Sequence, residues 1–115
     1  MNTPRFQDPR VAPLVDWFEA LTPVTLSRVR EFYAAEARFK DPFHDVTGPA
    51  AIRRIFEHMF ESLQAPRFVV TEALVQGDQC VLIWDFHCRF KRGPHTEQVI
   101  RGASHLRFDA QGRVQ

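Results

Sequence analysis

The segment Asp41-Pro42-Phe43-His44 places a carboxylate and an imidazole three residues apart. A carboxylate can remove a proton from a carbon beside a carbonyl when burial raises its pKa, and an imidazole can pair with it or act as a second acid or base. The alternative is structural: Asp41 caps the loop through its side chain, Pro42 fixes the turn, and His44 is a solvent-exposed loop histidine. From the sequence alone, both interpretations stay open.

Few other side chains could take part in catalysis or metal binding. Tyr33 is the only tyrosine, and we expect its ring to pack in the core with the hydroxyl at the edge. Cys80 and Cys88 lie eight residues apart in one expected strand, beyond the reach of a disulfide. We interpret them as free, buried thiols of a cytoplasmic protein. Because the sequence lacks metal-ligand spacings and a glycine-rich phosphate loop, we expect no metal and no cofactor.

Three helices must precede the sheet, because apolar residues recur at helical spacing in three segments. We place the first helix within residues 8–21. The second begins after Thr22-Pro23 and reaches about residue 33. The third runs from 47 to about 63, where Ala65-Pro66 should stop it.

From Arg67 the apolar period changes to two, which predicts strands over residues 67–76, 79–91 and 96–108. Gly77-Asp78 is a two-residue turn between the first two strands. The even positions of the middle strand, 80–90, carry no charged side chain and should face the helices. The odd positions are semi-polar and should face solvent or a partner. Residues 113–115 resemble the opening of one more strand, so we expect the final strand to be truncated.

Composition excludes several classes of function. The 115 residues predict a single domain, 1–115, and 15 basic against 14 acidic residues give a formal net charge of +1. This balance argues against nucleic-acid or anionic-membrane binding, and no apolar run is long enough for a membrane span or a secretory signal. Eleven Phe and two Trp provide a large aromatic surface, to be buried or offered to an apolar ligand.

The order of these features resembles a known superfamily. A helix pair, a short strand ending in Asp41-Pro42-Phe43, a third helix begun at Gly48, and a long meander ending in Arg107-Phe108-Asp109 and Gly112-Arg113-Val114 are similar to the nuclear transport factor 2-like proteins. Within them, the SnoaL-like polyketide cyclases and ketosteroid isomerases are the nearest branches. The resemblance covers residues 14–115. It implies an α+β cone, with three N-terminal helices packed on a curved antiparallel sheet around an apolar pocket.

The resemblance also assigns residues. Asp41 falls where the isomerases place their catalytic carboxylate, at the rim of an apolar cavity. Trp17, or Phe18, falls at a position of their oxyanion hole and lacks a hydroxyl, and Ser104 falls at the other. An indole N–H and a serine hydroxyl can still donate to a developing oxyanion, but more weakly. Steroid isomerisation is therefore not expected.

Two functions are compatible with this sequence. In the first, the protein binds a small hydrophobic, carbonyl-bearing ligand and acts as an isomerase or cyclase, with Asp41 as general base and His44 assisting. In the second, it is a non-catalytic ligand-binding or dimerisation module whose pocket is filled by its own side chains. The expected pocket residues are Trp17, Phe18, Tyr33, Phe56, Phe60, Trp84, Phe86 and Ser104.

A polar set lies on the outward positions of the last two strands. It resembles the Asp–Arg pair of limonene epoxide hydrolases, but those aspartates face the pocket, whereas strand phase puts this set outside. We therefore interpret it as a cross-strand charge network at a homodimer interface. The residues are Asp85, His87, Arg89, Arg101 and His105.

Overall fold

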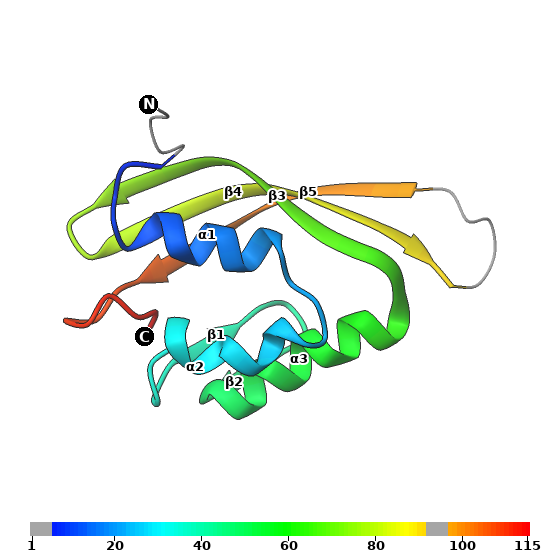
Figure 1. Ribbon diagram of the computed structural model, residues 1–115, viewed down its shortest axis with the longest axis horizontal. Helices are drawn as coiled ribbons and strands as arrows, with labels where there is room; N and C mark the ends of the chain where they lie inside the picture. Colours follow the sequence, from blue (N-terminus) through cyan, green and yellow to red (C-terminus); the bar gives the residue numbers. More distant parts are fainter. Residues whose placement is uncertain (1–5, 92–96) are drawn as a thin grey trace.

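In the computed structural model, which describes residues 6–91 and 97–115, all helices lie on one side of a three-stranded antiparallel sheet (Figure 1). The sheet has the order β3-β4-β5, formed by Leu63–Gln76, Gln79–Phe90 and Glu97–Arg107. A separate hairpin, β1 (Arg38–Lys40) and β2 (Asp45–Thr47), lies beside the helices. The predicted order of helices followed by an antiparallel meander is confirmed.

The helical layer begins with α1 (Val11–Glu19). The predicted second helix is a 3₁₀ turn, η1 (Thr25–Arg28), followed by a four-residue α2 (Val29–Phe32). This segment begins where Thr22 and Thr25 each accept the backbone N–H of the other, at 2.8 and 3.1 Å. No helix within the described ranges is long and apolar enough to cross a membrane.

The third helix, α3, spans Pro49–Ser62, close to its predicted range. Gly48 precedes it with φ +94°, a backbone conformation that residues with a side chain rarely adopt. Pro49 occupies the first turn. Ile52 and Phe56 are buried on one face of the helix. This face packs α3 against the aromatic interior beneath the sheet.

The strand β3 begins at Leu63, directly after α3, and not at Arg67 as predicted. Ala65-Pro66 does not end the pairing, because the register shifts between Gln64 and Arg67, where Ala65 takes φ +49°. A bulge of this kind accommodates a proline within a strand. The connection between the predicted strands 79–91 and 96–108 lies outside the described residues.

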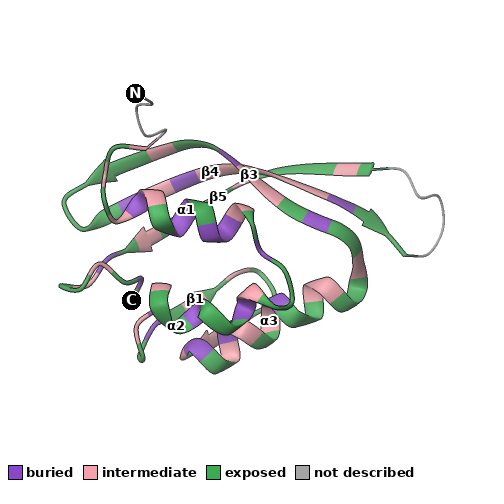
Figure 2. Ribbon diagram, in the orientation of Figure 1, coloured by how far each residue is buried: buried purple, intermediate pink, exposed green. Residues whose placement is uncertain are grey.

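The two faces of β4 divide as the sequence predicts. Cys80, Leu82 and Cys88 on the even phase are buried, whereas the odd phase remains partly exposed. Buried positions recur along α1, and the buried positions of β4 are separated by partly buried ones (Figure 2). The face of the sheet that carries the even positions is called the inner face below, and the opposite one the outer face.

Residues 113–115 connect the end of α2 to the sheet. Val114 forms a parallel bridge with Tyr33 and an antiparallel bridge with Phe108. Its carbonyl accepts the N–H of Ala34 at 2.7 Å, and its own N–H donates to Phe32 at 2.7 Å. The predicted opening of a further strand therefore pairs on both sides.

Candidate ligand-binding site

The four residues Asp41–His44 form the loop of the β1–β2 hairpin. The Asp41 N–H donates to the carbonyl of His44 at 2.9 Å and closes this loop. Oδ1 of Asp41 accepts the N–H groups of Phe43 and His44, at 2.8 and 2.6 Å, and lies 3.0 Å from Nδ1 of the His44 ring. These contacts agree with the structural alternative for Asp41, in which its side chain caps the loop by accepting backbone N–H groups.

The electrostatics of Asp41 differ from those expected of a general base in an apolar cavity. Burial raises the pKa of Asp41, but hydrogen bonds from the Phe43 and His44 backbones and from the His44 ring outweigh it, and the pKa lies below the ordinary value of 3.8. The side chain is 31% exposed. Asp41 is therefore a stable carboxylate near neutral pH, with weak basicity.

The same contacts assign His44 a clearer chemical capacity. Both Asp41 carboxylate oxygens lie 3.0–3.1 Å from Nδ1 of His44, so the carboxylate can hold the proton on that nitrogen. The other ring nitrogen, Nε2, would then be the one able to accept a proton. The pair thus has the arrangement of an oriented base, at the solvent-exposed tip of a hairpin.

The expected pocket residues separate into two groups. The first group is fully packed: Trp17 stacks on Phe32 with ring centroids 4.8 Å apart, and Phe18 stacks on Phe68 at 4.2 Å. Phe56 meets the edges of Trp17 and Phe18, each at 6.4 Å. The Trp17 N–H donates to the carbonyl of Thr25 at 2.9 Å, so it is not available to a ligand. This half of the interior is filled by the protein itself.

Tyr33 belongs to the packed group but has a free hydroxyl. The residue is 8% exposed, and burial raises the pKa of its phenol to about 12. Among the described residues, no hydrogen bond involves this hydroxyl, and no buried side-chain oxygen or nitrogen lacks a partner. The hydroxyl therefore reaches the molecular surface, as expected, and remains a protonated donor at physiological pH.

The second group is only half buried and lies on the inner face of the sheet, except for Phe60, which belongs to α3. It contains Phe60, Trp84, Phe86 and Ser104. Sequence analysis missed two neighbours: Phe68 and Ile100 both lie opposite Phe86, on β3 and β5. Ile100 is 52% exposed although it shares the phase that faces the helices. The alternating pattern within each strand could have placed these residues on the same face of the sheet. The register of the strands, which places them side by side, is seen only in the structure.

Trp84 and Ser104 are directly connected. The indole N–H of Trp84 donates to Oγ of Ser104 at 3.0 Å. The hydroxyl proton of Ser104 has no acceptor among the described residues. Ser104 therefore remains a possible donor to a ligand, as the sequence predicted, whereas Trp17 does not.

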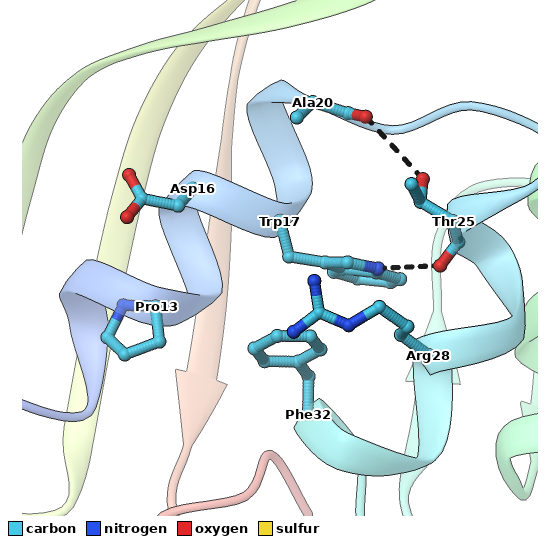
Figure 3. A pocket seen from close by; sticks show the side chains of 7 residues that line it. All are labelled: Pro13, Asp16, Trp17, Ala20, Thr25, Arg28 and Phe32. Atoms are coloured by element: carbon cyan, nitrogen blue, oxygen red, sulfur yellow. Dashed lines mark hydrogen bonds between the residues drawn. The ribbon is translucent and has the colours of Figure 1, made fainter.

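A cavity of about 300 Å³ opens between α1 and the η1–α2 segment (Figure 3). The Arg28 guanidinium lies over the Phe32 ring and also pairs with Glu31 at 2.9 Å. Of the expected pocket residues, this cavity includes only Trp17. A second cavity of about 260 Å³ lies between the N-terminal segment and β3. The lining residues of the first are Pro13, Asp16, Trp17, Ala20, Thr25, Arg28 and Phe32.

On the outer face, charged groups pair with one another. Arg101 contacts Asp85 at 3.2 Å, and His87 contacts Glu97 at 2.9 Å. His105 bonds to the Gln79 side chain at 2.9 Å. The cross-strand network expected for this face is thus present. Val81 and Ile83 are partly buried beside it, and Val99 is exposed.

Thiol and metal chemistry find little support in the described ranges. Burial is the main cause that raises the pKa of both Cys80 and Cys88, so neither is an activated thiolate. Residues 6–91 and 97–115 contain no group of three His, Cys, Asp or Glu side chains placed to hold a metal ion.

The sequence matches one protein family over most of its length. Residues 14–115 match the family described as the SnoaL-like domain. The chain belongs to the SnoaL-like domain family. The superfamily resemblance inferred from the sequence is therefore confirmed, over the range predicted. No curated protein matches the chain.

Solved structures of low sequence identity share the fold. A hypothetical protein with a ketosteroid isomerase-like fold from Catenulispora acidiphila, in complex with trimethylamine, is 17% identical with a TM-score of 0.78, over 95% of this chain and 82% of that one. A candidate SnoaL-like polyketide cyclase from Shewanella putrefaciens is 20% identical with a TM-score of 0.76, over 95% and 86%. TerC, co-crystallised with polyporic acid, is 15% identical with a TM-score of 0.78, over 93% and 86%. The α+β, nuclear transport factor 2-like fold is thereby established.

Proposed function

We propose that this SnoaL-like protein binds a small hydrophobic molecule bearing a carbonyl group, on the inner face of the sheet beside Trp84 and Phe86. The observation that carries the proposal is the uncovered apolar surface there. Ile100 and Phe90 share the inner phase and are 52% and 49% exposed. Large exposed apolar surface on a small protein is costly, and a bound apolar ligand would remove it from water.

The chemistry of this surface defines the class of ligand. Phe68, Trp84, Phe86, Ile100 and Ser104 share the inner phase, and none of these side chains carries a charge. The donor available on this surface is the neutral hydroxyl of Ser104, which suits a carbonyl oxygen better than an ionised group. The structure of TerC with polyporic acid is consistent with small-molecule binding in this fold.

Binding of a simple aromatic ketone, 2-acetylnaphthalene, tests the proposal. We expect saturable binding to the wild type, measured by ligand-observed NMR, and about tenfold weaker binding to Phe86→Ser, because apolar contact area is lost. The matched control is Val99→Ser on the outer face, which should bind as the wild type does. A folded wild type that binds no ketone, or equal binding by all three proteins, would contradict the proposal.

Proton transfer is a second candidate activity, favoured by the Asp41–His44 pair. In this isomerase- or cyclase-like reaction, Asp41 was predicted as the base. The observed contacts suit a division in which Asp41 holds Nδ1–H of His44 and the free Nε2 takes the proton from the carbon beside the carbonyl. The released electron pair would form an enolate, which reprotonates at carbon.

Deuterium exchange at the methyl group of 2-acetylnaphthalene in heavy water measures that proton transfer directly. If His44 is the base and Asp41 its positioning partner, His44→Gln should abolish the protein-dependent rate and Asp41→Asn should lower it and shift its pH profile. Loss with Asp41→Asn but not with His44→Gln would make Asp41 the base. Binding without exchange in any protein would leave ligand binding as the function.

The outer face supports a separate proposal of self-association. We propose that a second copy of the chain covers Val81, Ile83 and Val99, with the Asp85–Arg101 pair at the rim. Apolar side chains ringed by polar groups are typical of protein interfaces. Sedimentation of wild type and an Arg101 charge reversal tests this proposal, as described below.

A further inference from the structure

The Trp84 indole lies across the neighbouring strand, over a glycine. Trp84 on β4 pairs directly with Gly102 on β5. A Cβ atom built on Gly102 would lie 2.4 to 2.8 Å from three carbons of the Trp84 ring. Real Cβ atoms do not approach other carbons this closely, so the ring can take this position only because residue 102 has no side chain.

The other end of the same ring is fixed by Ser104. The indole N–H donates to Ser104 Oγ at 3.0 Å, two residues along β5 from Gly102. Phe68 meets the ring edge-to-face at 5.2 Å from the β3 side. Three strands thus define where the indole lies, and the ring forms part of the half-exposed inner face.

The hydrogen bond also determines what Ser104 can do. A serine hydroxyl has one proton and two lone pairs, and one lone pair is taken by the indole N–H. The remaining proton must point away from that N–H, and it has no acceptor among the described residues. It is available to an oxygen atom placed against the indole face.

We propose that Gly102 is a specificity-determining residue of the ligand site: its missing side chain seats the Trp84 indole, and the seated indole directs the Ser104 hydroxyl proton at the carbonyl oxygen of the ligand. This inference rests on the proposed function, since it names how the same surface recognises its ligand. Gly102 and Trp84 are positioning residues, and Ser104 makes the contact.

The position of the Trp84 indole over Gly102 can be tested without a ligand, by measuring the indole N–H resonances of the two tryptophans in NMR spectra. Gly102→Ala should shift the Trp84 resonance, assigned with Trp84→Phe, because the added methyl group displaces the ring. The Trp17 indole, which bonds to Thr25, is an internal control and should not move. Ala103→Ser, on the outer phase of β5, is the matched variant. An unshifted Trp84 resonance in Gly102→Ala would contradict the role of Gly102 in positioning the indole.

Recognition of the carbonyl is tested with two probes, 2-acetylnaphthalene and the hydrocarbon 2-ethylnaphthalene. Ser104→Ala should weaken ketone binding about three- to tenfold, the usual range for one hydrogen bond, and leave hydrocarbon binding unchanged. Ser104→Thr, which keeps the hydroxyl, should restore ketone binding. Gly102→Ala should weaken ketone binding more than hydrocarbon binding, because the displaced indole no longer directs the Ser104 proton at the carbonyl oxygen; equal loss for the two probes would contradict a role of Gly102 in specificity.

The carbonyl stretching frequency of the bound ketone gives the decisive reading. A hydrogen bond from Ser104 lowers this frequency, so it should rise in Ser104→Ala and return in Ser104→Thr. A ketone that binds equally well to Ser104→Ala, with an unchanged frequency, would overturn this inference and leave the proposed function standing. If the folded wild type binds neither probe, the proposed function fails and the role of Ser104 fails with it.

Discussion

The two faces of the β3–β4–β5 sheet use their polar groups in opposite ways. On the outer face, Asp85 forms an ion pair with Arg101 and His87 contacts Glu97, so these polar groups satisfy one another. On the inner face, the polar group is neutral and has an unused proton, that of Ser104. A hydroxyl proton without a protein acceptor is available for recognition, whereas a charge in an ion pair mainly affects solubility and contacts between copies.

The comparison also separates contributions to stability from contributions to function. The fully buried inner residues, such as Leu82 and Val70, hold the layers together, and the half-buried ones nearer Ile100 offer surface. Exposed ion pairs on the outer face contribute little to stability, because water already solvates each charge. Substitutions on the two faces should therefore differ in their effects on stability and on binding.

The largest effect should come from truncating the inner face. Leu82 is 2% exposed, so Leu82→Ala should lower the free energy of unfolding by about 3 kcal/mol, from lost burial and a residual cavity. Its outward neighbour Ile83 is only partly buried, and Ile83→Ala should cost about 1 kcal/mol. Urea unfolding followed by circular dichroism measures both. Equal losses of unfolding free energy in the two variants would contradict the conclusion that the inner face contributes more to stability than the outer face.

An added methyl group tests the same contrast from the opposite direction. Gly102→Ala should lower the free energy of unfolding by about 2 kcal/mol, because the methyl group collides with the Trp84 ring. Ala103→Ser adds one atom at the neighbouring outer position and should change stability by less than about 0.5 kcal/mol. Thermal unfolding of both variants under one condition checks the difference, and a neutral Gly102→Ala would contradict it.

The ion pair between Asp8 and Arg10, at one end of the sheet, should contribute more to the free energy of unfolding than the ion pairs on the outer face. Arg10 donates to both oxygens of Asp8, at 3.0 and 2.7 Å, and to the carbonyl of Gly77 in the β3–β4 turn. The hydrogen bond from the Arg10 side chain is the main cause that lowers the pKa of Asp8 from 3.8 to about 2. Asp8→Asn should therefore cost about 1 kcal/mol at pH 7, after allowance for solvent screening.

The sign of the pH dependence follows from the lowered pKa. The folded state holds the Asp8 carboxylate more strongly ionised than the unfolded state, so its contribution is fully present above pH 3.8 and is lost as pH falls through about 2. The stability difference between wild type and Asp8→Asn should shrink across that window. Asp16→Asn, at an exposed position on α1 with no ion pair among the described residues, is the matched substitution for this comparison.

The smallest effect on folding should come from the outer face. Reversing Arg101 to Glu breaks an exposed pair and should change the free energy of unfolding by no more than about 0.5 kcal/mol. Its effect on association should be large, because two like charges would face each other across the proposed interface. Sedimentation should then give a monomer for Arg101→Glu and a dimer for the wild type. An unchanged mass would remove the interface assignment.

Periodicity predicted the elements well, because alternation in β4 and helical spacing in α1 and α3 report directly which face is buried. The errors have local causes. The reciprocal bonds of Thr22 and Thr25 begin a 3₁₀ turn where a regular helix was expected. The bulge at Ala65 lets β3 begin before a proline that was expected to separate helix from strand.

The site was only partly predictable. Residue phase correctly placed Ser104 on the inner face, because the alternating pattern fixes it. The partners of a polar atom depend on three-dimensional neighbours, so the sequence did not indicate that Thr25 takes the Trp17 N–H or that Gly102 seats Trp84. The hairpin amides that lower the pKa of Asp41 are local, and the capping alternative anticipated them.

The pairing of residues 113–115 has a consequence for the kinetics of ligand entry. Val114 is bonded to Phe32 and Ala34 on one side, while Arg113 and Gln115 bond to Asp109 and Arg107 on the other. Separating the end of α2 from the sheet therefore requires at least the two backbone hydrogen bonds on one side of Val114 to break together. Amide exchange with heavy water at Ala34 and Val114 should consequently report the rate at which the interior opens, and that rate sets the upper limit for how fast a bulky molecule can enter.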